Sequence, residues 1–333
     1  MADDSYYQAV VCTRLAGPAG LELQSFARRA LSPGEVRVAI AAAGVNFPDL
    51  LMTRGAYQYK PPLPFVPGME AAGVIVEIAS NVPDLTVGQR VMINTRVGLF
   101  ATEATVDARC VVPAPDSFSL TDAACLLVAA RTARHALVDR AQTQPGETVL
   151  VLGAAGGVGL AAVEIANLLG ARVIAAASSD EKLRIAISRG ATHGINYLQG
   201  DLVDQARALV PQGIDVIFDP VGGELFEQAL RLPAWNGRVL IVGFASGRIG
   251  LAPANRMLIR GFNLLGVRAG EAARRNPALA EQSARDIEAW TAAGHLKPHV
   301  SATFPLAEAQ RALQEIADRR AIGRIALLAS DSQ

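Results

Sequence analysis

Hydrophobic and polar positions divide the chain into two parts with different periods. Up to residue 112, short apolar runs alternate with turn residues, which is typical of β-strands. Four prolines between residues 60 and 68 remove backbone donors, so no regular element is expected there. Strands are predicted at residues 7–13, 21–26, 35–40, 72–78 and 89–93, and a short helix at 46–54. The first part therefore predicts a small barrel or sandwich.

From residue 121 the pattern changes to alternating helices and strands. A long amphipathic helix is predicted at residues 121–141. Strands at 147–153, 171–177, 193–197, 214–219, 238–243 and 263–267 then alternate with helices at 157–169, 180–189, 200–210 and 223–231. This alternation predicts an α/β domain with a doubly wound, parallel, six-stranded sheet. Helices at 277–293 and 305–317 and a strand at 324–328 follow.

The C-terminal segment is too short to be a domain of its own, and 333 residues are long for a single hydrophobic core. We therefore expect two domains, with the second inserted into the first. The β-rich domain is predicted to comprise residues 1–124 and 266–333. The parallel-sheet domain is predicted to comprise residues 125–265.

The segment 149–159 reads VLVLGAAGGVG and contains the most informative motif of the chain. A predicted strand runs into a glycine-rich turn and then into a helix, in the spacing G-x-G-x-x-G with alanine first. Gly156 would let the backbone approach a pyrophosphate, and Gly159 would let the helix pack closely on the strand. A diphosphate would bind the free N–H groups at the helix start. The residues expected to bind it are Ala154, Gly156, Gly157, Val158 and Gly159.

The end of the next strand indicates which dinucleotide would bind. An NAD site has an acidic residue there, about 20 residues beyond the glycines, for the ribose 2′-hydroxyl. This chain has Ser178 instead, and Lys182 follows one helical turn later. Both can bind a 2′-phosphate, which favours NADPH over NADH. Asp180 and Glu181 are explained by their place at a helix start.

Composition excludes several classes of protein. Lys and Arg number 31 and so do Asp and Glu, with no basic block, which gives nucleic-acid binding no support. Cys12, Cys110 and Cys125 form no metal-binding or disulfide pattern. No signal peptide and no membrane-spanning run is recognised, so a cytoplasmic location is expected.

Several stretches together resemble one family. They are AGVNFPD at 43–49, RGAY at 54–57, VPGMEAAG at 66–73, AAGGVG at 154–159, Gly190-Ala191 and Ile195-Asn196-Tyr197. The chain resembles, over nearly its whole length, the zinc-free NADPH:quinone oxidoreductase (ζ-crystallin-like) branch of the medium-chain dehydrogenase/reductase superfamily. The resemblance implies a GroES-like catalytic domain with an inserted Rossmann domain.

The resemblance also suggests that no metal is present. The zinc-dependent alcohol dehydrogenases have a cysteine ligand where this chain has Asn46, and a histidine where it has Met69. Catalytic zinc needs three ligands of the Cys, His or carboxylate type, and only Glu70 remains. A quinone is electrophilic enough to accept hydride without a Lewis acid, provided that it is oriented and given hydrogen-bond donors.

By the same resemblance, Asn46, Asp49 and Tyr57 face the nicotinamide, and Asn46 or Tyr57 donates to the substrate oxygen. The alternatives are that Asn46 and Asp49 are capping residues and that Tyr57 packs in a loop. The resemblance also assigns to the cofactor site Thr132, Tyr197, Val221, Phe244 and one of Arg319 and Arg320. Which of the two arginines binds the phosphate stays open.

Three functions are compatible with this sequence. The first is an NADPH-dependent quinone reductase. The second is an NADPH-dependent enoyl or alkenal reductase, which uses the same fold and also delivers a proton to carbon. The third is a non-catalytic NADPH-binding or RNA-binding protein. The apolar edge strand at 263–267 predicts in addition a homodimer that pairs two such edges.

Overall fold

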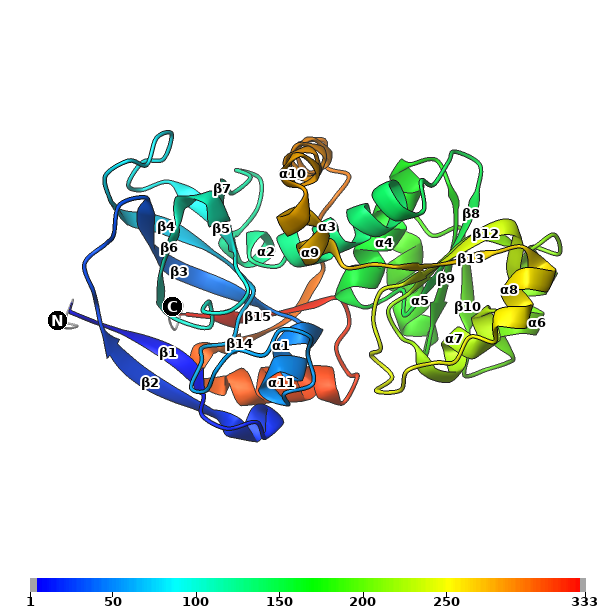
Figure 1. Ribbon diagram of the computed structural model, residues 1–333, viewed down its shortest axis with the longest axis horizontal. Coiled ribbons are helices and arrows are strands. Elements are labelled where there is room, and N and C mark those ends of the chain that lie inside the picture. Colours follow the sequence, from blue (N-terminus) through cyan, green and yellow to red (C-terminus); the bar gives the residue numbers. More distant parts are fainter. Residues whose placement is uncertain (1–4, 330–333) are drawn as a thin grey trace. The chain divides into compact units, whose positions relative to one another are not determined.

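The computed structural model describes residues 5–329 of the chain (Figure 1). It divides into two compact units, and each is described by itself. Unit 1 comprises residues up to 128 and from 298 onward, and unit 2 comprises residues 129–297. The mixed α/β fold class predicted from the sequence is confirmed, because unit 1 is β-rich and unit 2 has a parallel sheet flanked by helices.

Unit 1 contains a hairpin and a seven-stranded sheet. The hairpin pairs β1 (Tyr6–Cys12) with β2 (Leu21–Ala27). The sheet has the order β14-β15-β3-β4-β5-β7, and β6 also pairs with β3. Its strands are β3 (Glu35–Val45), β4 (Glu70–Ile78), β5 (Arg90–Asn94), β6 (Glu103–Asp107), β7 (Val111–Pro113), β14 (Val300–Pro305) and β15 (Arg324–Leu328). The C-terminal strand β15 lies antiparallel to β3.

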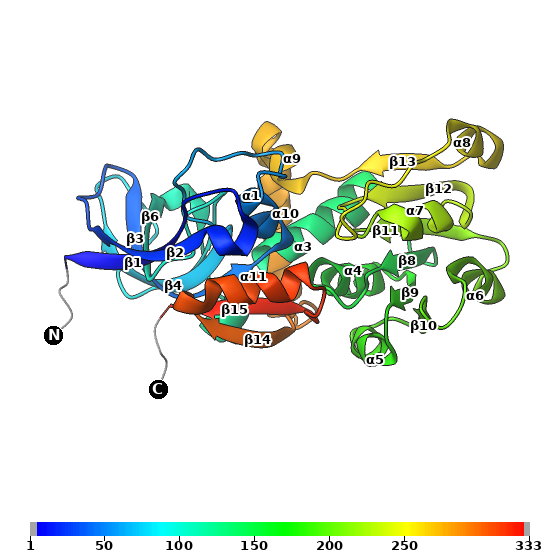
Figure 2. The same ribbon diagram turned by 90° about the horizontal axis from the view of Figure 1, so that it is seen from below.

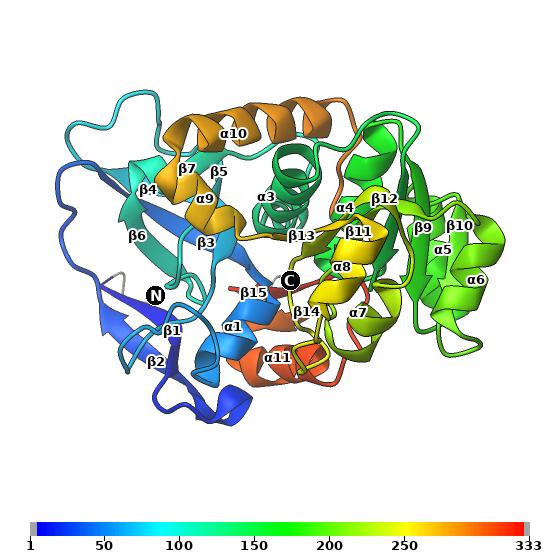
Figure 3. The same ribbon diagram turned by 45° about the vertical axis from the view of Figure 1, so that its right-hand side comes forward.

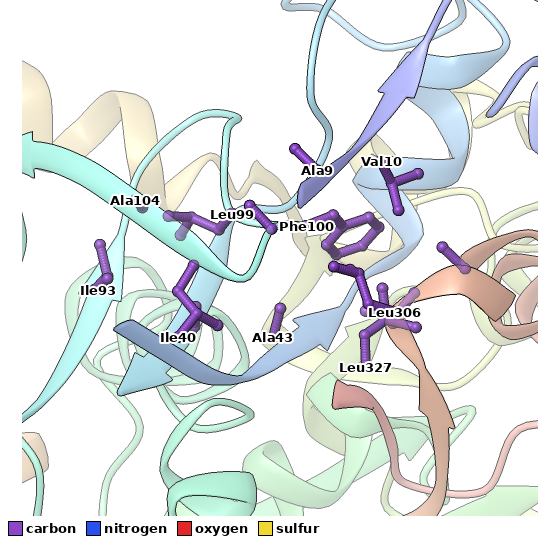
Figure 4. Packing of buried hydrophobic residues seen from close by; sticks show 14 of the residues in the cluster. Ala9, Val10, Ile40, Ala43, Ile93, Leu99, Phe100, Ala104, Leu306 and Leu327 are labelled. Atoms are coloured by element: carbon purple, nitrogen blue, oxygen red, sulfur yellow. The ribbon is translucent and has the colours of Figure 1, made fainter. Parts of the chain in front are cut away.

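Short helices complete unit 1. They are α1 (Phe47–Thr53), α2 (Leu120–Ala123), α11 (Ala309–Ala317) and the 3₁₀ turns at Gly17–Gly20, Ala108–Cys110 and Leu306–Glu308. Side chains from distant segments meet in one apolar core, in which Phe100 lies near Leu306 and Leu327 (Figure 4). This core fixes the strands whose ends and connections carry the polar residues considered below.

Unit 2 contains six parallel strands in the order β10-β9-β8-β11-β12-β13, which Figure 2 shows from one end of the sheet to the other. The strands are β8 (Thr148–Leu152), β9 (Arg172–Ala177), β10 (His193–Asn196), β11 (Ile214–Asp219), β12 (Pro233–Ile241) and β13 (Asn263–Gly266). The chain order reverses between β8 and β11, so this is a doubly wound sheet with its switch point there. Ligands of such sheets bind beyond the carboxyl ends of the strands at that point.

Helices surround the central strands of unit 2. They are α4 (Gly157–Leu168), α5 (Asp180–Ser188), α6 (Leu202–Leu209), α7 (Gly223–Ala229), α8 (Ala254–Arg260), α9 (Ala269–Arg275) and α10 (Pro277–Ala292). The β8 side chains of Leu150 and Leu152 pack in a cluster with α6 and α7, whereas Val149 and Val151 alternate with them and are also buried. Burial of both faces explains why the parallel strands are continuous apolar runs.

The long helix predicted at residues 121–141 is interrupted in the structure. After α2 the chain makes a turn, continues as α3 (Leu127–Arg134), and ends in a π-helix (His135–Arg140). The prediction of one helix was therefore wrong. The carboxylate of Glu70, from a strand 58 residues earlier, accepts a hydrogen bond of 2.9 Å from the Val128 N–H and so caps a new helix start. The amphipathic pattern of residues 121–141 could not reveal this break, because Glu70 lies outside that segment.

The second boundary between the domains also differs from the prediction. We expected the chain to leave the parallel-sheet domain at residue 266, but residues 266–297 belong to unit 2. Arg134 donates to Asp286 of α10 at 2.7 Å, and Figure 3 shows α10 above α3. Arg189 at the end of α5 donates to the Lys297 carbonyl at 2.8 Å. These polar contacts, absent from the hydrophobic pattern, hold the segment in unit 2.

Candidate functional site

The glycine turn between β8 and α4 is tightly packed. Gly153 has a positive φ of +58°, a conformation that suits glycine. A Cβ on Gly159 would lie 2.3 Å from the Gly153 carbonyl oxygen and 2.9 Å from the Cα of Ala154. No side chain fits at Gly159 unless α4 moves, which is the close helix-to-strand packing that the motif predicted.

Gly156 has a different environment from Gly159. It is the N-cap residue of α4, and no side chain in the described part of the chain caps that helix. A Cβ on Gly156 would come within 4 Å of a single atom, the Gly153 carbonyl oxygen at 3.4 Å. The space above the helix start is therefore open, and the first N–H groups of α4 at Gly157 and Val158 suit an anionic group such as a diphosphate.

The carboxyl end of the neighbouring strand β9 brings together two residues that were predicted to bind a 2′-phosphate. Ser178 follows β9 directly, and the Lys182 ammonium donates to its hydroxyl at 3.2 Å. The N-cap of α5 is Ser179, whose hydroxyl accepts from the Lys182 N–H at 3.3 Å. This cap sets the helix one turn beyond the strand and thereby aims the Lys182 side chain back at Ser178.

Asp180 is held away from the pair formed by Ser178 and Lys182. Its carboxylate accepts from the Asn196 amide at 2.8 Å, and Asn196 ends the neighbouring strand β10. The next residue, Tyr197, donates its N–H to the Ala177 carbonyl at 3.2 Å. Tyr197 thus lies beside the end of β9.

The connection that follows β11 lies at the switch point. One carboxylate oxygen of the buried Asp219 accepts from the N–H groups of Val221 at 2.7 Å and Gly222 at 2.9 Å. A Cβ on Gly153 would be 3.0 Å from the Val221 side chain, so this loop touches the glycine turn. A Cβ on Gly222 would be 2.8 Å from Phe244, which places Phe244 in the adjacent loop after β12.

The second carboxylate oxygen of Asp219 is buried and has no hydrogen-bond partner among the described residues. Burial raises the pKa of Asp219 to about 6, although the two backbone donors favour the charged form. The buried Asp219 side chain thus fixes the backbone of the loop that contains Val221.

The predicted residues of unit 1 belong to a buried polar cluster. The Asn46 amide donates to the Gly44 carbonyl at 3.2 Å and to Glu70 at 3.1 Å, and its oxygen accepts from Arg324 at 2.9 Å. Arg324 also forms an ion pair with Glu70. Asn46, Glu70 and Arg324 are each no more than 5% exposed. Both amide hydrogens of Asn46 therefore already have acceptors inside unit 1.

Asp49 is fully buried behind this cluster. Its carboxylate accepts from the Asn46 N–H at 2.9 Å, as in a capping box of α1, and from the Gly68 N–H at 3.1 Å. Burial raises the pKa of Asp49 to about 7, against the effect of the two backbone donors. Burial acts to lower the pKa of the Arg324 guanidinium, but Glu70 and the other acidic neighbours together raise it. The geometry of Asp49 matches the capping alternative.

The structure places the remaining predicted residues on different elements. Tyr57 is partly buried against the core of unit 1, in the loop after α1. Thr132 lies in α3, on the unit 2 side of the boundary. Arg320 forms ion pairs with Glu315 at 2.8 Å and Asp318 at 2.6 Å, in unit 1. Arg319, with a positive φ of 59°, turns the chain after α11.

Comparison with known proteins identifies the family. The profile described as the alcohol dehydrogenase GroES-like domain matches residues 32–116, and that of the zinc-binding dehydrogenase matches residues 157–284. The rat protein named quinone oxidoreductase-like protein 2 is 40% identical over 97% of this chain and 92% of its own length. The chain belongs to the quinone oxidoreductases of the medium-chain dehydrogenase/reductase superfamily. This confirms the resemblance found in the sequence.

Solved structures of this family agree with the fold. The quinone oxidoreductase of Thermus thermophilus, also determined with NADPH, has a TM-score of 0.85 and 34% identity, covering 96% of this chain and 99% of that one. The Escherichia coli quinone oxidoreductase in complex with NADPH has a TM-score of 0.88 and 26% identity, covering 96% and 99%. The GroES-like plus Rossmann architecture expected from the sequence is thereby confirmed.

Although one matching profile is named for zinc, the residues of this chain do not fit that ion. Asn46 offers an amide that is already bonded, and Glu70 is paired with a guanidinium that would repel a cation. The nearby Cys125 thiol keeps its proton, because burial raises its pKa to about 12. No group of three His, Cys, Asp or Glu side chains able to hold a metal occurs among residues 5–329.

The sequence analysis missed three residues of these sites. Arg324 completes the cluster of unit 1, Asp219 organises the switch-point loop, and Gly153 starts the glycine turn. The segment Asp219-Pro-Val-Gly-Gly, with two glycines directly after a strand, carried a signal that could have identified Asp219. Nothing near Arg324 in the sequence indicates that its partners lie 254 and 278 residues away.

Proposed function

We propose that this protein is an oxidoreductase that transfers hydride from NADPH to quinones without a metal. The observation that carries the proposal is the pair formed by Lys182 and Ser178 beside the uncapped start of α4. The helix start suits a diphosphate, and the pair suits the 2′-phosphate that distinguishes NADPH from NADH. The quinone is proposed from the names of the relatives and from the chemistry of unit 1.

Bound NADPH supplies the hydride, and the residues of this chain bind and orient. Gly156 leaves room for the diphosphate, and Lys182 neutralises the 2′-phosphate. Tyr197 and one of Arg319 and Arg320 are proposed to complete the adenosine end; Arg320 pairs with Glu315 and Asp318. Val221, Phe244 and Thr132 are proposed to border the nicotinamide.

On the substrate side, Tyr57 is proposed to donate to the reacting quinone oxygen. We assign Asn46 to the support of that site, because both of its amide hydrogens are already donated to Gly44 and Glu70. Asp49 fixes the start of α1 and the Gly68 loop from behind. A quinone needs only orientation and hydrogen-bond donors, so the proposed reaction requires no metal.

The test is oxidation of NADPH and NADH by the purified protein in the presence of 1,4-naphthoquinone, an α,β-unsaturated aldehyde or a crotonyl thioester. We expect turnover with the quinone, preference for NADPH, and no loss of rate with a chelator. Turnover of the enal or thioester alone would support the enoyl or alkenal reductase instead. Stoichiometric zinc that is lost together with activity would contradict the metal-free mechanism. Salt-dependent RNA retention without any turnover would support a non-catalytic role.

We also propose a homodimer that forms through β13. This strand is the edge of the unit 2 sheet, and an unpaired apolar edge invites pairing. Trp235, Leu258 and Ile259, at 72%, 83% and 71% exposure, lie on β12 and on α8 just before that edge. A two-fold axis would cover them in both copies. Light scattering at micromolar concentration should give the mass of two chains, and the mass of one chain would contradict the proposal.

None of the helices in residues 5–329 has the length and apolar character needed to cross a membrane.

A further inference from the structure

Two loops of unit 1 form a fixed platform on the proposed substrate side. The first, residues 54–69, joins α1 to β4 and contains Tyr57; the second, residues 95–102, joins β5 to β6. Gly98 donates to the Val66 carbonyl at 2.7 Å, and Phe100 donates to the Pro67 carbonyl at 2.9 Å. A Cβ on Gly68 would lie 2.5 Å from the Phe100 nitrogen, so the two backbones are in direct contact. The loops therefore hold a constant geometry.

A cation is held on this platform by an aromatic ring. The guanidinium carbon of Arg96, in the second loop, lies 5.0 Å from the ring centre of Tyr59 in the first loop. Tyr59 is partly buried against the unit 1 core, whereas Arg96 is exposed. This cation–π contact restrains the guanidinium without neutralising it, and it does so two residues from Tyr57.

The charged residues of the two platform loops are all positive. Residues 54–69 contain Arg54 and Lys60, residues 95–102 contain Arg96, and neither loop contains an Asp or Glu. Within residues 5–329, no carboxylate lies within ion-pair distance of Arg96. A restrained and uncompensated guanidinium binds carboxylates, sulfonates and phosphates, because its planar donors match their oxygens.

We propose that Arg96 is a specificity-determining residue that favours substrates with an anionic substituent away from the reacting carbonyl. Tyr59 is the positioning residue that holds Arg96 in place. The proposal rests on the proposed function, which puts the substrate beside Tyr57. It adds the class of substrate: a quinone that carries a carboxylate, sulfonate or phosphate group.

The experiment compares kcat/KM for a matched pair, 1,2-naphthoquinone and 1,2-naphthoquinone-4-sulfonate, in the wild type and in Arg96→Met, Arg96→Lys and Tyr59→Leu. We expect the ratio of sulfonate to neutral quinone to fall about tenfold in Arg96→Met, as for loss of a partly exposed charge pair. Arg96→Lys should retain part of the ratio, because it keeps the charge but not the planar donors. Tyr59→Leu should lower the ratio less than Arg96→Met does.

Arg109→Met is the matched control, since Arg109 is an exposed arginine of the same unit that pairs with Asp107. It should leave the ratio unchanged. Calorimetric binding of 1-naphthalenesulfonate gives a readout that needs no turnover, and Arg96→Met should weaken it about fivefold. An unchanged ratio and an unchanged affinity in Arg96→Met would overturn the inference. If the wild type reduces neither quinone, the proposed function fails, and the binding measurement alone decides the role of Arg96.

Discussion

The two candidate sites of this protein are built in opposite ways. The site of unit 2 consists mainly of backbone: an uncapped helix start, Gly156 with open space, and Gly159 with none. The site of unit 1 rests on side chains that neutralise one another, with Glu70 and Arg324 at its centre. A backbone site is encoded by a few adjacent residues, whereas the side-chain site needs partners from both ends of the chain.

This difference determines how each site responds to change. A glycine turn loses function when an added atom occupies the ligand's space, and its fold is affected only where the added atom meets the protein itself. A buried ion pair loses stability when either partner is removed, because the other charge is then buried without compensation. The predictions that follow compare these two responses, from the largest expected effect to the smallest.

Arg324→Met should destabilise unit 1 by about 3 to 5 kcal/mol, because it leaves Glu70 buried and unpaired. The double variant Glu70→Gln, Arg324→Met should recover part of this loss, since no charge then remains. Urea unfolding followed by circular dichroism measures both effects. Arg320→Met is the control: its ion pairs are exposed, so it should cost about 1 kcal/mol or less. Equal losses in Arg324→Met and Arg320→Met would show that burial of the pair is unimportant.

Tyr57→Phe should lower kcat with quinones about a hundredfold, as expected for loss of one donor to a developing oxyanion. The Kd for NADPH should stay the same, because Tyr57 is assigned to the substrate. Stopped-flow hydride transfer and fluorescence titration separate the two quantities. Tyr6→Phe, at an exposed position of β1, is the matched control. A Tyr57→Phe protein that reduces every quinone at the wild-type rate would reduce Tyr57 to loop packing.

Lys182→Ala should weaken NADPH binding about tenfold or more, through loss of a charged donor to the 2′-phosphate. NADH binding should hardly change, since NADH lacks that phosphate. Arg184→Ala, an exposed residue of the same helix, controls for general effects of charge. Titration of each variant with both cofactors provides the comparison. Equal weakening of NADPH and NADH would show that the phosphate site is misplaced.

The pH dependence of stability tests whether the buried carboxyl group of Asp219 contributes to the folding of unit 2. Burial raises its pKa to about 6 from an ordinary value of 3.8, so the folded state holds the proton more tightly than the unfolded state. The stability that this proton provides is complete below pH 4 and is lost as the pH rises to 6. Relative to Asp219→Asn, the wild type should therefore lose roughly 2 kcal/mol between pH 4 and pH 7. Unfolding curves with the same pH dependence for both proteins would refute this assignment.

The sequence predicted the parallel sheet and its glycine turn well, for a physical reason. A strand buried on both faces is continuously apolar, and the close approach at Gly159 excludes any side chain. Both constraints act within a few neighbouring residues, so they leave a local pattern. The pair formed by Ser178 and Lys182 was predicted for the same reason, since one helical turn separates them.

The cluster of unit 1 could not be predicted in this way. Asn46 was recognised, but its partner Arg324 is 278 residues away. The residues around each of them do not indicate that the two are in contact. The break before α3 has the same origin, because the Glu70 carboxylate that caps it belongs to a different strand. The short strands β6, β7 and β14 were missed because they owe their form to pairing with neighbours rather than to their own pattern.

The boundary between the two units falls at residues 128 and 129, inside α3. A chimera that takes its nucleotide-binding half from a relative must therefore avoid a junction there, which would separate a helix from its own first turn. The turn at residues 124–126 is the better junction, since it lies between α2 and α3. Even so, the exchanged helix starts correctly only in a host that offers a carboxylate at the position of Glu70. We therefore expect a chimera to fold only if α3 and the strand that carries Glu70, β4, come from compatible relatives.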